Sequence, residues 1–108
     1  MTYQVEISAQ AEADLDRLLA ALGAVSPKAA GRLARSFWRG VTRLRARPLS
    51  CGLAYESPDF SEEVRHLLFW ANPRRKYRAL FVVREEVVHV LCVRAPGEKP
   101  VRPEDLEA

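Results

Sequence analysis

The chain has 108 residues, of which 48% are hydrophobic and 29% charged, and its formal net charge is +3. This length suits one domain, and the composition excludes both a disordered and a fibrous chain. No apolar run of about 18 residues is present, and the first residues, MTYQVEIS, lack the pattern of a secretion signal. We therefore expect a single domain over residues 1–108 that is cytoplasmic and has no membrane contact.

Two cysteines, Cys51 and Cys92, lie far apart without the spacing of a metal or redox site. We expect both to be unpaired thiols. The chain lacks the motifs of phosphate-binding loops, dinucleotide-binding folds, zinc proteases and serine hydrolases. The sequence therefore predicts no metal and no cofactor.

Basic and acidic residues are separated along the chain. No acidic residue occurs between Asp16 and Glu56, although this interval holds seven arginines and one lysine. The acidic residues gather in residues 6–16, in residues 56–63 and at the C-terminus. This separation indicates an anionic partner, which could be a nucleic acid or an acidic protein.

The N-terminal part predicts one strand and one helix. Residues 3–7 alternate between apolar and polar side chains, as in a short strand. Ser8 can cap a helix whose apolar residues recur at helical spacing, and Gly23 stands where the glycine after a helix is common.

A second helix is predicted from Pro27, with Ser26 as its cap, to Arg47, because Pro48 then stops it. Four arginines share one of its faces: Arg32, Arg35, Arg39 and Arg43. They are either a solvated polar face or a binding surface, and the absence of any acidic residue beside them favours binding. Trp38 lies at the border of this face, where we expect it to edge the core.

The remaining chain predicts a loop followed by a sheet. Residues 48–63 are rich in proline, serine and glycine and form a long loop. Three strands are expected at residues 64–70, 76–84 and 87–94, and a short turn near residues 103–106 of the tail. The order is βααβββ, so we expect an α+β fold: a short N-terminal strand, a two-helix hairpin and an antiparallel meander with the helices on one face.

Arginines occupy fixed positions in the last two strands. Strict alternation puts Arg78 on the face opposite Tyr77, and groups Arg94 with Val88, Val90 and Cys92. Arg78 and Arg94 flank the hairpin turn almost symmetrically, so we expect them at the same edge of the sheet. There the two arginines are either the solvated charges of an ordinary sheet end or a site that holds phosphate. Because we expect both at an edge and not in the core, Arg78→Ala and Arg94→Ala should leave the fold intact.

Other basic residues extend this cluster. Arg74, Arg75 and Lys76 precede the middle strand, and Lys99 lies in the tail. Two histidines, His66 and His89, are isolated on strands and are more often structural than catalytic. His66 is the better candidate for a general base because it lies near the basic cluster.

The string Tyr-Arg-x-Leu-Phe at Tyr77 to Phe81, followed by the arginine that closes the last strand, resembles the RelE/ParE superfamily of toxins from bacterial type II toxin–antitoxin modules. The element order over nearly the whole chain is similar to that superfamily. The resemblance implies a cytoplasmic toxin, with the βααβββ fold, that a cognate antitoxin neutralises. The antitoxin is expected along the helix arginines Arg32, Arg35, Arg39 and Arg43, since opposite charge would steer it there.

In the RelE-like branch, the resemblance implies ribosome-dependent cleavage of mRNA without a metal. Arg78, Arg94 and Lys76 would then be catalytic, stabilising charge at the scissile phosphate, while Arg74, Arg75 and Lys99 would contact RNA. The family's histidine or tyrosine after the last strand is missing here, so no general acid or base is identified.

Two alternatives remain at this stage. The ParE-like branch inhibits DNA gyrase through protein contacts and does not cut RNA. A relative that has lost toxicity would only bind its antitoxin. The missing acid and base favour these two readings, whereas the basic cluster favours RNA cleavage.

Overall fold

The computed structural model describes residues 2–106, so residues 1, 107 and 108 of the expected domain lie outside the described residues. Its helices and strands are β1 (Gln4–Ile7), α1 (Ala9–Val25), α2 (Pro27–Ala46), β2 (Arg65–Asn72), β3 (Arg75–Arg84) and β4 (Val87–Arg94). Short 3₁₀ turns occur at Pro48–Ser50, Ser57–Asp59 and Pro103–Asp105. The α+β class and the βααβββ order are confirmed. Among the helices within residues 2–106, none has an apolar stretch that could span a membrane.

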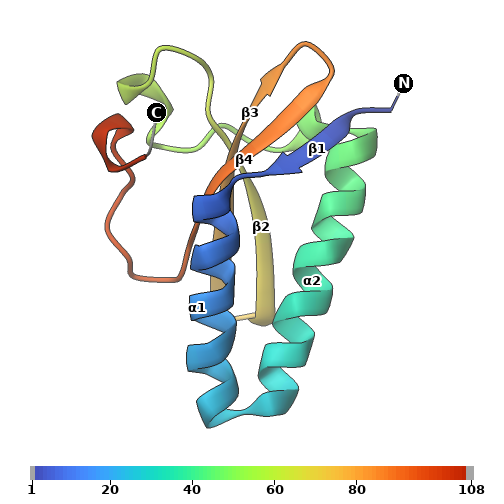
Figure 1. The fold of residues 1–108 in the computed structure, drawn as a ribbon, viewed down its shortest axis with the longest axis vertical. Coiled ribbons are helices and arrows are strands. Elements are labelled where there is room, and N and C mark those ends of the chain that lie inside the picture. Colours follow the sequence, from blue (N-terminus) through green and yellow to red (C-terminus); the bar gives the residue numbers. More distant parts are fainter. Residues whose placement is uncertain (1, 107–108) are drawn as a thin grey trace.

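The four strands form one sheet in the order β1-β4-β3-β2. The expected antiparallel meander of β2, β3 and β4 is present, with residues 85 and 86 in the tight turn between β3 and β4. β1 pairs with β4 in parallel, so the four-stranded sheet is mixed, while the expected antiparallel arrangement holds for β2, β3 and β4. The helical hairpin makes the parallel pairing possible, because it crosses one face of the sheet between β1 and the meander (Figure 1).

The two helices are separated by a single residue. Ser26 ends α1 by donating its backbone N–H to Leu22 O at 2.8 Å, and its Oγ caps α2 by accepting from the N–H of Ala29 at 3.2 Å. The expectation that Gly23 follows the first helix was wrong, since α1 continues to Val25. A Cβ at Gly23 would lie 3.6 Å from the Ala30 side chain, so the glycine is at the close crossing of the helices.

α2 packs tightly against β2. A Cβ on Gly40 would come within 2.5 Å of a methyl group of the buried Leu67, so any larger residue at this crossing would have to displace the Leu67 side chain. The rings of Phe37 on α2 and Phe69 on β2 also pack together, with 5.2 Å between their centroids. Near the end of the strand, Trp70 N–H donates to Ser36 Oγ at 3.1 Å. These contacts fix the side of α2 that is turned away from the solvent.

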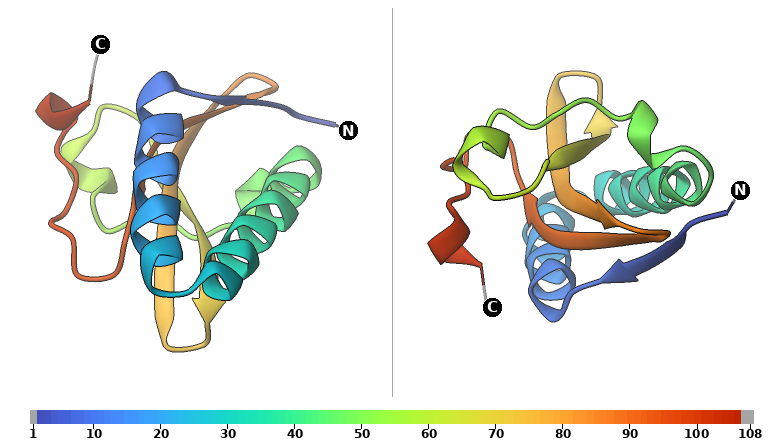
Figure 2. Two further views of the ribbon diagram at one scale, coloured as in Figure 1. Left: turned by 60° about the horizontal axis from the view of Figure 1, so that its bottom comes forward. Right: turned by 90° about the horizontal axis from the view of Figure 1, so that it is seen from above.

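Each face of the sheet has its own apolar core. The helices cover one face, where Leu33, Phe37 and Phe81 are fully buried. The other face is covered by residues 51–64, which we call the strap, and by residues 95–106, which we call the tail (Figure 2). Ala54 and Val64 of the strap and Val101 of the tail pack there. The strap and the tail therefore lie over the sheet face that carries Arg78.

A bulge in β4 changes which residues share a face. Phe81 pairs with Val90, but Leu80 pairs with Cys92, so Leu91 is an extra residue in β4. The strict alternation expected from the sequence was therefore wrong: Val90 belongs to the helix-side core and Cys92 to the strap-side core. α1 supports the bulge.

Ser8, which caps α1, and Asp14, in the second turn of α1, form hydrogen bonds with backbone groups of β4 beyond the part of β4 that pairs with β1. Ser8 Oγ–H donates to Leu91 O at 3.0 Å, and Val93 N–H donates to Asp14 Oδ2 at 3.0 Å. Both groups would otherwise lack a partner in the sheet ladder. The bulge is thus a built feature that shifts the end of β4 by one residue.

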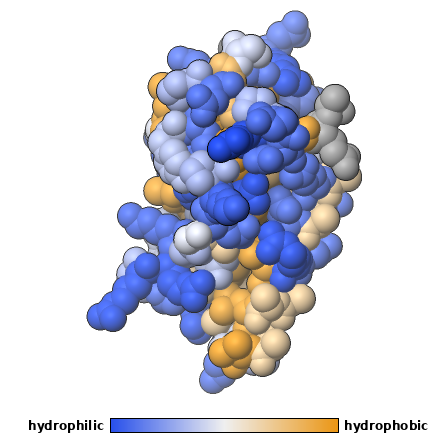
Figure 3. Space-filling model, turned by 90° about the vertical axis from the view of Figure 1, so that its left-hand side faces the viewer, coloured by the Kyte–Doolittle hydropathy of each residue, from blue (hydrophilic) through white to orange (hydrophobic). Residues whose placement is uncertain are grey.

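The surface over α1 and the tail is mainly hydrophilic, with apolar side chains gathered toward the end where the two helices meet (Figure 3). Val25, at that end, is 86% exposed. Exposed apolar residues elsewhere include Trp38 on α2 and Trp70 on β2.

Candidate functional site

Arg78 and Arg94 lie directly opposite one another on β3 and β4, which confirms that the two residues lie side by side. The bulge at Leu91 makes this possible, because without the extra residue Val93 would face Arg78. The pair is at the end of β4 but within β3, because Arg78 also pairs with Leu68 of β2. Only 14% of the Arg78 side chain and 19% of the Arg94 side chain are exposed. Like charges opposite each other on neighbouring strands repel, so this pair requires counter-charges.

Glu56 of the strap supplies the counter-charge of Arg78. Its carboxylate accepts from Arg78 Nη1 at 2.8 Å and from Nη2 at 2.7 Å, a two-pronged ion pair. The same carboxylate accepts from Val101 N–H of the tail at 3.1 Å. With only 1% of its side chain exposed, Glu56 joins the strap, the tail and the sheet at one point.

The protonation behaviour of Glu56 follows from these contacts. Burial by itself raises the pKa of Glu56, but the hydrogen bonds from Arg78 and Val101 and the charge of Arg78 outweigh it, so the pKa lies below its usual value. The hydrogen bonds that Arg78 donates to Glu56 likewise raise the pKa of Arg78. The pair is therefore ionised, and Arg78 has a carboxylate where a substrate phosphate was expected.

Two further groups border Arg78. The guanidinium carbon of Arg78 lies 4.6 Å from the ring centre of Tyr55, and Nη2 donates to the Tyr55 hydroxyl at 3.2 Å. His66 has a buried Nδ1 without a hydrogen-bond partner within residues 2–106. Burial, followed by the charge of Arg78, lowers the pKa of His66.

Tyr55 was missed by the sequence reasoning because a tyrosine was sought only after the last strand. Tyr55 instead precedes β2 in the chain, and the strap places it against Arg78 of β3.

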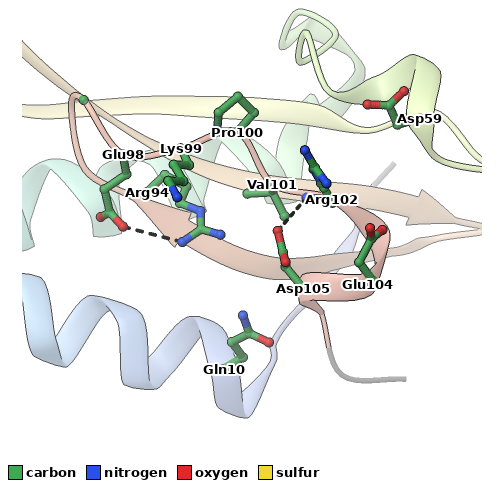
Figure 4. Close-up of a pocket in the computed structure, with 11 residues that line it drawn as sticks. Gln10, Asp59, Arg94, Glu98, Lys99, Pro100, Val101, Arg102, Glu104 and Asp105 are labelled. Carbon is green, nitrogen blue, oxygen red and sulfur yellow. Dashed lines mark hydrogen bonds and ion pairs between the residues drawn. The ribbon is translucent and has the colours of Figure 1, made fainter.

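Arg94 is neutralised by the tail. Its Nη1 lies 3.5 Å from Glu98 Oε2 (Figure 4). The other oxygen of Glu98 accepts from Ala95 N–H at 2.9 Å. The Nε of Arg94 is buried and has no hydrogen-bond partner among the described residues. Arg94 lines an open groove whose other charged residues are of both signs: Asp59, Glu98, Lys99, Arg102, Glu104 and Asp105.

The other basic residues of the cluster lie farther out. Lys76 is exposed opposite Trp70 at the far end of β2 and β3, and Arg74 and Arg75 lie in or beside the exposed turn there. Lys99 is exposed in the tail and lines the groove beside Arg94. The structure therefore brings Arg78 and Arg94 together and leaves the four remaining basic residues at the rim.

The four arginines predicted to bind an antitoxin are all exposed on α2, but they differ in their contacts. Arg32 Nε donates to Ala71 O at 3.0 Å, and Arg43 donates to Ser50 Oγ at 3.2 Å, so these two attach the helix to neighbouring segments. Arg35 and Arg39 form no ion pair and no side-chain hydrogen bond within residues 2–106.

A shallow hollow separates Arg35 and Arg39. Its walls come from Ala34, Arg35, Trp38, Arg39 and Thr42. Trp38 is 54% exposed, and its ring packs edge-on against Phe37 at 5.1 Å. This contact confirms the prediction that Trp38 lies at the edge of the core. The exposed part of the Trp38 side chain borders the hollow.

A second strap glutamate pairs with β3 in the same way as Glu56. Glu62 accepts from Arg84 Nε at 3.1 Å and from Nη2 at 2.7 Å, but 37% of Glu62 and 55% of Arg84 are exposed. In both pairs the glutamate precedes its arginine by 22 residues. This repeated spacing was a signal in the sequence for the strap contacts, which the reading of residues 48–63 as a loop overlooked.

The cysteines are both buried and unpaired, as expected. Burial raises the pKa of Cys92 to about 12, so its thiol is inert at neutral pH. Within residues 2–106, no three His, Cys, Asp or Glu side chains come together in a way that could hold a metal ion. Comparisons of the chain with models of protein families and with curated proteins find no match.

Proposed function

We propose that this chain is the toxin of a type II toxin–antitoxin module with a RelE/ParE-like fold, and that it acts through protein contacts in the manner of the gyrase-inhibiting branch. The element order and the arginines that begin and end the hairpin support the family. The contacts of those arginines support the branch.

One observation carries the choice between branches: Arg78 is already bound by the buried carboxylate of Glu56. A metal-independent nuclease needs unpaired cationic groups at the scissile phosphate, because charge stabilisation is the main contribution such a site makes. Arg94 is similarly engaged by Glu98. With the strap closed, neither arginine offers a full set of donors to RNA.

The helix arginines support recognition of an acidic protein. Arg35 and Arg39 lie on either side of an apolar hollow beside Trp38, and no carboxylate within residues 2–106 pairs with them. Arginine and tryptophan are the residues that most often carry the energy of protein interfaces. We infer that an acidic antitoxin segment lies along this face of α2.

Ribosome-dependent mRNA cleavage is the second candidate, and a specific arrangement favours it. Arg78, the Tyr55 hydroxyl and His66 lie near one another on the strap-side face, and Lys76 and Trp70 extend that face toward the β2–β3 turn. Aromatic and basic side chains of this kind can bind single-stranded RNA. This function requires Arg78 to exchange Glu56 for a phosphate.

The test compares the two activities in one preparation. The purified protein is assayed for inhibition of gyrase supercoiling and for cleavage of mRNA on ribosomes. We expect loss of supercoiling and intact mRNA, with relief of both growth inhibition and gyrase inhibition when the protein encoded by the adjacent reading frame is added. Cleavage with normal supercoiling would select the nuclease instead. Normal growth at high expression would remove the toxin proposal.

A further inference from the structure

Glu56 occupies a position that resembles a bound ligand more than an ordinary surface contact. Its carboxylate receives donors from two separate parts of the molecule: the two Nη atoms of Arg78 on β3 and the N–H of Val101 in the tail. The strap contributes the carboxylate itself. A planar anion is thus held by a fork of donors, an arrangement suited to carboxylate and phosphate oxygens.

The donors are held in place without help from Glu56. Arg78 lies on β3, which has a strand on each side, and Arg94 lies directly opposite it. Val101 is 1% exposed and packs in the strap-side core with Leu80 and Cys92. The Nε of Arg94 is buried without a hydrogen-bond partner within residues 2–106, and Nη1 of the same guanidinium lies 3.5 Å from Glu98 Oε2, so Arg94 is held by the tail and not by Glu56.

The geometry points to a carboxylate-binding site, formed by Arg78 and the Val101 N–H beside Arg94, that the chain closes with its own Glu56. Glu56 is therefore a latch between the strap and the sheet: it fills the site in the wild type, and an external carboxylate of the same shape can bind there once the Glu56 carboxylate is removed. This inference does not depend on whether the target is gyrase, mRNA or neither.

The second strap glutamate shows what an ordinary contact looks like. Glu62 pairs with Arg84 in equally good geometry, but both side chains are exposed and the structure gives Glu62 no backbone donor. Solvent already competes at that position. Removing the Glu62 carboxylate should therefore leave no enclosed site that an anion can fill. Glu62→Ala is the matched control for Glu56→Ala.

The experiment is a rescue of Glu56→Ala by small anions. Thermal unfolding of the wild type, Glu56→Ala and Glu62→Ala is followed in sodium acetate and in sodium chloride at equal ionic strength, with sodium phosphate as a third arm. Acetate should raise the Tm of Glu56→Ala above its value in chloride by at least about 4 °C, because a ligand bound only by the folded state stabilises it. Wild type and Glu62→Ala should respond equally to acetate and chloride.

Two further measurements separate an anion site from a general salt effect. Adding Arg78→Met to Glu56→Ala should abolish the response to acetate. Amide hydrogen exchange at Val101 should become faster in Glu56→Ala and slow again in acetate, since that N–H regains its acceptor. An equal Tm of Glu56→Ala in acetate and chloride, or a response that survives Arg78→Met, would overturn the inference.

If Glu56→Ala does not fold in either salt, the same comparison uses Glu56→Gln, which keeps the side-chain shape but removes the charge. The amide can accept from only one arm of Arg78, so the strap is held less firmly and acetate can replace it. An acetate-specific rise in Tm supports the latch, and identical curves in the two salts contradict it. A larger response to phosphate than to acetate would indicate that the site prefers phosphate oxygens.

Discussion

Two groups of arginines differ in their surroundings: Arg78 and Arg94 on the strap-side face of the sheet are engaged by carboxylates, whereas Arg35 and Arg39 on the exposed face of α2 are open to a partner. Arg78 is bound by Glu56 and Arg94 by Glu98, and both are largely buried. Arg35 and Arg39 are exposed and have no acidic partner within residues 2–106. The difference shows that a cluster of basic residues indicates a binding site only after its internal carboxylates have been located.

The charge pattern of the sequence explains this outcome. The acidic residues at 56–63 fold back onto the strand arginines, whereas the interval from Asp16 to Glu56, which contains α2, has none to fold back. The excess of positive charge is therefore concentrated on α2, which has six basic residues and no acidic one. This distribution can steer an acidic partner toward α2.

The largest expected effect comes from removing Arg78. Arg78→Met leaves the buried carboxylate of Glu56 without its counter-charge, which should lower the free energy of unfolding by about 3–5 kcal/mol. Urea denaturation measures this loss. Arg84→Met, the same change in the exposed pair with Glu62, should cost at most about 1 kcal/mol. The sequence-based expectation that Arg78 can be replaced with the fold unaffected is thus reversed, and equal costs for the two variants would restore it.

Reversing the charges on α2 tests the other region. Arg35→Glu combined with Arg39→Glu should weaken binding of an acidic antitoxin by about tenfold or more, mainly through slower association, because rim charges act on the encounter. The free energy of unfolding should change by less than about 0.5 kcal/mol, since neither side chain has a partner to lose.

The matched control for this variant is Lys28→Glu combined with Arg45→Glu, which makes the same change in net charge at other exposed positions of α2. Surface plasmon resonance at low and moderate salt compares the two. An equal loss of affinity in both variants would mean that only the overall charge matters and not the face around Trp38.

His66 predicts a pH dependence of the strap-side face. Its pKa is lowered in the folded protein from an ordinary value of 6.5, so the unfolded chain binds more protons as the pH falls below 6.5. Stability should therefore be full above that pH and fall by up to about 1.4 kcal/mol per pH unit until the folded-state pKa is reached. Unfolding curves between pH 7.5 and 5.5 should show this slope, and His66→Gln should reduce it. An unchanged slope in His66→Gln would exclude the histidine as its cause.

The smallest expected effect concerns salt. The exposed pair of Arg84 and Glu62 is screened by ions, whereas the buried pair of Arg78 and Glu56 is not. Glu62→Gln should cost at most about 1 kcal/mol at low ionic strength and nothing measurable at about 1 M salt. A cost that persists at high salt would place this pair in the same class as the buried one.

Much of the fold follows from local patterns. The helices and the three meander strands were predicted from apolar periodicity and from Ser26, Pro27 and Pro48, because caps and breakers act within a few residues. A glycine at a helix crossing and a glycine after a helix end look alike in sequence. For that reason the sequence predicted that the first helix ends before Gly23, whereas it continues to Val25. The parallel pairing of β1 with β4 depends on distant contacts that no local pattern encodes.

The sequence predicted that Arg78 and Arg94 lie together, but not that carboxylates of the same chain already bind them. Counting residues brought Arg78 and Arg94 to one edge, although the pairing depends on the bulge at Leu91, which period-two counting cannot detect. The engagement of Arg78 depends on how a loop of 3₁₀ turns folds over the sheet, and this is set by packing of Ala54 and Val64 on the far face. The repeated 22-residue spacing from glutamate to arginine was the available clue.

The most direct test of whether the sheet arginine is neutralised from within is a double-mutant cycle of Arg78→Met and Glu56→Gln, run beside the cycle of Arg84→Met and Glu62→Gln. Urea unfolding gives the coupling energy of each pair. We predict a coupling above about 2 kcal/mol for the buried pair and below about 1 kcal/mol for the exposed pair. A coupling below about 0.5 kcal/mol between Arg78 and Glu56 would contradict the account and return Arg78 to the role of a cation available to substrate.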